Sequence, residues 1–141
     1  MSATPFGQNW PTSWTTDSVL NGTPTVAAGA YSSNSATIAN YGASPNEVLD
    51  TEITVDVAYG ATITGGGAIV YICRRTRTGW ESPANDSPAS FTVPVVASTT
   101  RSKTVTVPGL VGDFQVVVFN PATNSTITPT LASRPSQGQS G

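Results

Sequence analysis

Apolar and polar side chains alternate along several short stretches of the chain. In the clearest one, residues 50–59, apolar side chains recur at every second position from Ile53 to Tyr59. Successive side chains of a β-strand point to opposite faces, so this pattern predicts a half-buried strand. Residues 103–107 alternate in the same way. Residues 68–75 and 114–119 are apolar on both faces until their ends, which is typical of central strands covered on both sides.

Four shorter stretches complete the predicted strands, namely residues 25–28, 35–41, 91–96 and 126–131. Pro94 and Pro129 lie inside two of them, which favours edge strands or bulges, because proline cannot donate a hydrogen bond to a neighbouring strand. No window of the chain shows a helical stripe. About eight short strands without helices predict an all-β, antiparallel β-sandwich, and we expect a jelly-roll-like arrangement rather than an immunoglobulin-like one.

Both ends of the chain differ from this pattern. Residues 1–24 contain three prolines and no apolar period, so we predict an extended N-terminal arm outside a sandwich domain of residues 25–131. The arm nevertheless carries Phe6, Trp10 and Trp14, and large aromatic side chains favour burial, so we expect it to dock against another surface. Residues 132–141 are almost free of apolar side chains and predict a flexible C-terminal tail.

The composition excludes several kinds of chemistry. Only 10% of the 141 residues are charged, while 22 Thr and 16 Ser supply most of the polar groups. There is no histidine and one cysteine, so neither a catalytic triad with histidine nor a His/Cys zinc site can form, and no internal disulfide is possible. We therefore expect no metal, no cofactor and no enzymatic activity.

The charge and hydropathy of the chain disfavour some classes of binding partner. The net charge of −2 does not favour nucleic-acid binding, and the longest apolar run is far too short for a membrane helix. The first residues have neither a basic nor an apolar segment of the kind found in secretory signals. We thus expect synthesis in the cytoplasm, without nucleic-acid or membrane partners.

Two groups of side chains could carry a function. Asp50, Glu52 and Asp56 share one face of a predicted strand, and neighbouring carboxylates there lie about 6.5–7 Å apart. That separation would suit an inverting glycosidase, although the solvated face of a half-buried strand explains it as well. Arg74, Arg75 and Arg77 hold half of the basic residues at one strand end, where they could contact an acidic partner or simply be exposed to solvent.

Trp80 follows Gly79 in a loop rich in serine and proline. Its indole could stack on a sugar ring or pack beneath its own loop, and the second arrangement is the more common one for a loop tryptophan. Together with Phe6, Trp10, Trp14, Arg74, Arg75 and Arg77, it makes up the candidate partner-binding set.

Several segments also resemble a known kind of protein. They are residues 18–22, 26–31, 51–57, 68–75, 79–82, 103–107 and 114–124. In the sequence style of these segments, the chain is similar to the small accessory virion proteins of tailed bacteriophages, the β-sandwich decoration or cement-like head proteins. The resemblance implies a non-enzymatic structural role on the outside of a capsid shell. It also implies the major capsid protein and further copies of the chain as partners, a trimer as the family-level oligomer, and location in the virion.

The sequence thus leaves three functions open. The first is capsid decoration, in which the sandwich bridges capsid subunits and stabilises the shell. The second is a tail, neck or fibre protein of the virion, in which Trp80 and residues 81–87 contact host-surface glycans. The third is a glycosidase that uses Glu52 with Asp50 or Asp56.

Overall fold

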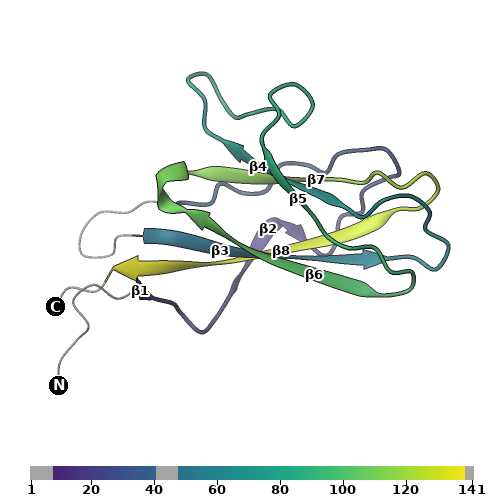
Figure 1. Ribbon diagram of the computed structural model, residues 1–141, viewed down its shortest axis with the longest axis horizontal. Coiled ribbons are helices and arrows are strands. Elements are labelled where there is room, and N and C mark those ends of the chain that lie inside the picture. The colour runs from purple at the N-terminus through teal and green to yellow at the C-terminus, as the bar shows by residue number, and fades with distance from the viewer. Residues whose placement is uncertain (1–7, 41–47, 139–141) are drawn as a thin grey trace.

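The computed structural model describes residues 8–40 and 48–138 and confirms the antiparallel β-sandwich (Figure 1). Within these residues eight strands form a five-stranded and a three-stranded sheet. The strands are β1 (Gln8–Asn9), β2 (Thr15–Asn21), β3 (Val48–Tyr59), β4 (Ile69–Arg74), β5 (Ala89–Thr92), β6 (Thr100–Pro108), β7 (Phe114–Phe119) and β8 (Ile127–Gly138). No helix in this part of the chain has the length and apolarity needed to cross a membrane.

The larger sheet is built around β3 and β8, its two longest strands. Its order is β1-β8-β3-β6, and β2 also pairs with β8, on the edge that β1 uses. Opposite residues in the β3–β6 pair run from Asp50 with Pro108 to Ala58 with Thr100, without a register shift. This unbroken register gives residues 50–58 of β3 one face toward the core and one face toward solvent.

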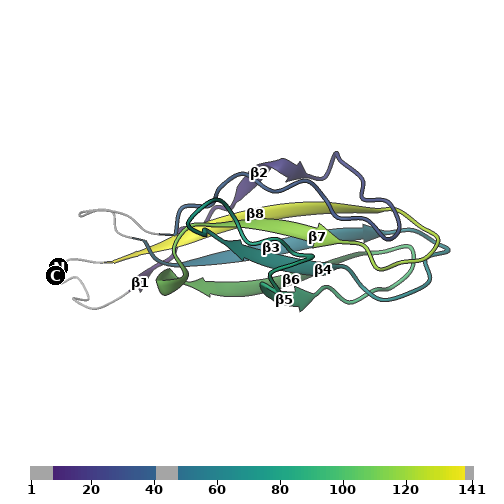
Figure 2. The ribbon, with the colours of Figure 1, turned by 90° about the horizontal axis from the view of Figure 1, so that it is seen from above.

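The smaller sheet has the order β5-β4-β7 and covers the inner face of the larger one (Figure 2). We expected β7 to be central, but it is the last strand of its sheet. Residues 29–38 lie along its outer edge instead, with isolated bridges from Tyr31 to Phe119 and from Ile38 to Phe114. The hydroxyl oxygens of Ser32 and Ser35 accept hydrogen bonds from N–H groups of β7, so the edge is satisfied without a full strand.

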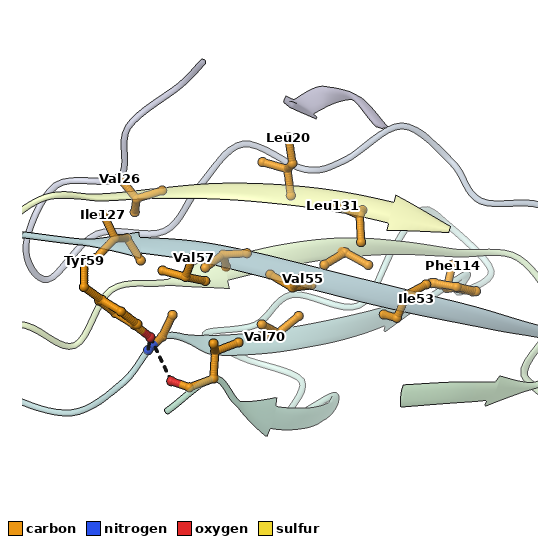
Figure 3. Close-up of a cluster of buried hydrophobic side chains, with 14 of the residues drawn as sticks. Leu20, Val26, Ile53, Val55, Val57, Tyr59, Val70, Phe114, Ile127 and Leu131 are labelled. Carbon is orange, nitrogen blue, oxygen red and sulfur yellow. Dashed lines mark hydrogen bonds between the residues drawn. The ribbon is translucent and has the colours of Figure 1, made fainter. Parts of the chain in front are cut away.

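The core lies between the two sheets (Figure 3). The alternating apolar side chains of β3 point into it, and each of Ile53, Val55 and Val57 is fully buried. The Tyr59 hydroxyl donates to the carbonyl of Val93 (2.8 Å) and accepts the N–H of Ala68 (2.9 Å), which satisfies this polar group inside the core. From the smaller sheet, the buried side chains of Phe114, Val116 and Val118 of β7 form the opposite side of this core.

Residues 8–21 are part of the sandwich, and in this the structure differs from the predicted arm. β1 and β2 add to the free edge of β8, with Gln8 opposite Gly138 and Thr16 opposite Ala132. The register shifts within β2, and the Asp17 carboxylate holds the irregular part by accepting the N–H groups of Val19 and Leu20. Because the long strand β8 would otherwise leave its backbone groups unpaired, this segment docks there.

The predicted flexible tail is also corrected, because β8 continues to Gly138. Its C-terminal half is polar, so no apolar period marks it, and backbone pairing with β3 and β1 keeps it in the sheet. The same strand carries Pro129 and Pro135, yet it is internal to the sheet rather than at its edge. Both prolines fall outside the residues that β2 and β1 pair with, so neither strand requires an N–H from them.

The remaining short predictions have mixed outcomes. The stretch at 91–96 shares only residues 91 and 92 with strand β5, which forms an edge of its sheet, and Pro94 lies beyond the end of that strand. The stretches at 25–28 and 35–41 are not regular strands: Val26 and Ile38 form isolated bridges, and residue 41 lies outside the described residues.

Candidate functional site

Trp10, Trp14 and Arg134 meet on the outer face of the larger sheet. The Arg134 guanidinium lies 4.6 Å from the ring centre of Trp14 and 5.6 Å from that of Trp10. It comes from β8, opposite Glu52 of β3, and both its Nε and its Nη2 lie 2.7 Å from one carboxylate oxygen of Glu52. A further N–H donates to the carbonyl of Pro11 at 3.1 Å. One arginine thus fixes the segment before β2 to the sheet.

This arrangement leaves Trp14 partly uncovered beside a hollow. The Trp14 side chain is 37% exposed, although most large apolar side chains in the described residues are buried. The hollow has a volume of about 300 Å³ and is lined by Trp14, Thr54, Asp56 and Ala132. We call these four residues the Trp14 surface. It combines a flat apolar ring, a hydroxyl and a carboxylate within one shallow site.

The sheet around the Trp14 surface is rich in hydroxyl groups. The outward positions of β6 are Thr100, Ser102, Thr104 and Thr106, all of them exposed. Thr104 and Thr54 share a hydrogen bond of 2.8 Å, and the Ser102 hydroxyl donates to Asp56. The outward side chains of β6 are therefore uncharged hydroxyl groups, on the same face as the exposed indole.

The three carboxylates considered for catalysis lie on this outer face, but they have different surroundings. Glu52 is paired with Arg134, Asp50 accepts the N–H of Gly109 (3.1 Å), and Asp56 accepts from Ser102. Each of the three therefore already has a hydrogen-bonding or ion-pair partner within the fold. In residues 8–40 and 48–138, no three His, Cys, Asp or Glu side chains gather as metal ligands would.

The second predicted group lies on the smaller sheet. Arg75, the residue after β4, packs over the ring of Trp80 (4.4 Å) and lies 3.8 Å from the Asp113 carboxylate. Trp80 therefore packs against its own hairpin, in which the N–H of Thr76 donates to the carbonyl of Gly79. Arg74 and Arg77 are exposed and belong to no ion pair formed among the described residues.

Other features of the fold are occupied by internal contacts. A second groove, of about 360 Å³, lies beside β2 and is lined by Asp17 and mostly by small and hydroxyl side chains. Asp17 is already bonded to three backbone N–H groups, those of Val19, Leu20 and Ala36. Cys73 is buried, and burial, with Glu81 and Asp86 nearby, raises the pKa of its thiol to about 11. Neither feature offers a free reactive group.

The structure thus divides the predicted binding residues into two sets, Trp10 with Trp14 and Arg75 with Trp80. Phe6 lies outside the described residues. The sequence missed Arg134, Thr54 and Ala132, because Arg134 and Ala132 fall within the predicted tail. The available signal was the placement of Glu52 on the solvent face of its strand, where a carboxylate commonly faces a basic residue of the next strand.

No protein-family model and no curated protein sequence matches this chain. Among solved structures, it is similar to a carbohydrate-binding module (CBM6cm-2) of Cellvibrio mixtus lichenase 5A, determined in complex with cellotriose. The two share 15% sequence identity with a TM-score of 0.42, over 90% of this chain and 86% of the other. At these values the similarity carries no argument about a ligand, which has to come from the geometry of the site itself.

Proposed function

We propose that this protein is a non-catalytic carbohydrate-binding domain that holds a sugar ring on the Trp14 surface. The observation that carries the proposal is the partly exposed Trp14 indole, fixed by Arg134 at the edge of a hollow that also contains a carboxylate and a hydroxyl. A sugar ring has an apolar face of C–H groups and a rim of hydroxyls. The Trp14 surface offers a complementary group for each.

The rigidity of the site supports this function. Binding costs less when the contacting side chains are already ordered, and an aromatic ring has few rotamers to lose. The Arg134 guanidinium lies over Trp14 and is itself held by Glu52 and by the carbonyl of Pro11. The volume of about 300 Å³ is at the lower end of the range of small-molecule sites, as expected for a site that binds sugar rings weakly and reversibly.

The proposal develops the second of the functions predicted from the sequence, but it moves the glycan contact from Trp80 to Trp14. Trp80 packs against Arg75, whereas Trp14 faces an open hollow. A glycan-binding role is compatible with a tail, neck or fibre protein of a virion. Capsid decoration, with the capsid protein and further copies of the chain as partners, stays a prediction from the resemblance.

The test is binding of the full-length protein to a glycan array, followed by titration of the strongest ligand. We expect Trp14→Ala to weaken binding about 30-fold or more, because truncating a central aromatic side chain at an interface typically costs about 2 kcal/mol or more. Trp80→Ala is the matched control, since it removes a tryptophan of the smaller sheet. No binding to any glycan, or equal losses in both variants, would refute the proposal.

A further inference from the structure

The Trp14 surface has a marked charge asymmetry. Asp56 is the only charged side chain among the residues that line the hollow. The nearby cation, Arg134, is already paired with Glu52 and stacked on two indoles. Asp56 belongs to neither of the ion pairs formed among the described residues, so the lining of the hollow carries one negative charge and no positive one.

Asp56 is also held in a defined position. It lies opposite Ser102 in the unbroken β3–β6 register, and the Ser102 hydroxyl donates to its Oδ1 atom. Its neighbour Thr54 is tied to Thr104 in the same way. Two ordered oxygen-bearing groups therefore stand next to the Trp14 ring, and one of them carries a full negative charge.

A carboxylate distinguishes between classes of sugar. It accepts strong, charge-assisted hydrogen bonds from the hydroxyls of a neutral saccharide. It repels the carboxylate of a uronic or sialic acid and the sulfate of a sulfated sugar, since like charges a few ångströms apart are unfavourable even in water. None of the described residues that line the hollow is a cation that would offset this repulsion.

We infer that the Trp14 surface selects neutral saccharides over acidic ones, and that Asp56 determines this choice. The inference rests on the proposed function, because it specifies the ligand of the same site. In this inference Trp14 provides most of the binding affinity, and Asp56 makes the site prefer neutral sugars to negatively charged ones.

The experiment compares oligosaccharides that differ only in charge. The probes are cellohexaose against a β-1,4-glucuronate hexamer, and β-1,4-mannohexaose against a β-1,4-mannuronate hexamer, titrated into the full-length protein at low ionic strength. We expect about five-fold or greater preference for the neutral member of each bound pair, from the repulsion of charges about 4 Å apart. The preference should shrink in 1 M salt, where the screening length falls to about 3 Å.

Asp56→Asn should remove most of this preference while leaving the thermal melting temperature nearly unchanged, because asparagine keeps an oxygen for Ser102. Asp86→Asn is the matched control, since it removes one negative charge from the loop on the smaller sheet, and it should leave the preference intact.

The outcomes separate the two claims. If neither the array glycans nor the four hexamers bind, the proposed function fails. If they bind in a Trp14-dependent way but acidic members bind equally or better, the function stands and the inference is wrong. If Asp56→Asn does not change the preference, Asp56 is not its source and the inference is also wrong.

Discussion

Arg134 is the residue whose removal tests most directly how the N-terminal segment is attached. We consider Arg134→Met, which removes the charge and keeps most of the length of the side chain. The substitution removes two contacts to one oxygen of Glu52 at 2.7 Å, one hydrogen bond to the carbonyl of Pro11, and two cation–π contacts. All five contacts join β8 either to β3 or to the segment that precedes β2.

The expected loss in the free energy of unfolding depends on these contacts and on how far they are exposed to solvent. Hydrogen bonds to charged groups contribute about 1.5–3 kcal/mol. The Arg134 and Glu52 side chains are 26% and 21% exposed, so solvent screens the pair and the lower end applies. Cation–π contacts at partly exposed sites add about 0.5–1 kcal/mol each. We therefore expect Arg134→Met to lower the free energy of unfolding by about 2.5–3.5 kcal/mol.

The assay is urea denaturation followed by circular dichroism and tryptophan fluorescence, on Arg134→Met, Glu52→Gln and the double variant. The double-mutant cycle should give a coupling free energy of about 1–2 kcal/mol between the two residues. The emission of Trp10 and Trp14 should also change in the folded state of Arg134→Met. Arg77→Met, at an exposed position, is the control and should stay within about 0.5 kcal/mol of the parent protein.

A coupling below about 0.3 kcal/mol would refute this reasoning. In that case the pair would behave as an ordinary surface ion pair. Unchanged tryptophan emission in Arg134→Met would likewise show that the guanidinium does not hold the indoles.

Two further predictions concern buried groups. The unfolded Cys73 thiol has a pKa of about 8.5, and burial raises the pKa of the folded thiol to about 11. Unfolding between these pH values therefore releases a proton, and stability falls as pH rises through this window. The urea midpoint of Cys73→Ala should therefore fall less with rising pH than that of the parent protein. An equal pH dependence of the two midpoints would contradict this prediction. Ser35→Ala removes the hydroxyl that accepts the N–H of Val116 at 2.8 Å and should cost about 1–3 kcal/mol. Ser33→Ala, at an exposed position, should cost less than about 0.5 kcal/mol in the same urea series.

The strands that are apolar on one face or on both were predictable from the sequence, because burial dictates their side chains. Residues 114–119 are strand β7 as expected, and the alternation through residues 50–59 lies within β3. Burial does not dictate Ser35, whose side chain replaces a backbone partner of β7. A hydroxyl that takes the place of a backbone group leaves no periodic pattern in the sequence. Residues 35–41 were therefore predicted as a regular strand, whereas Ile38 forms only an isolated bridge to β7.

The site was predicted only in part, for a related reason. The aromatic content of residues 1–24 predicted that this segment docks on a surface, and Trp10 and Trp14 contact Arg134. That surface is β8 of the same chain, whose polar residues 133–137 show no strand pattern and are ordered by pairing with β3 and β1. Pairing between the first and last strands is a long-range property, and local sequence does not encode it.

The position of β8 also constrains the order in which the protein can form. β1 and β2 have β8 as their strand partner in the sheet, although more than a hundred residues separate them from it in the sequence. On the ribosome, the β3–β6 pair and the smaller sheet can assemble while the N-terminal segment has no strand to pair with. Because β8 follows the other described strands in the chain, its synthesis completes the larger sheet, and contacts of such long range predict folding in milliseconds to seconds rather than microseconds. The Trp14 surface, built from β3, β8 and the segment before β2, comes into existence only in that final step.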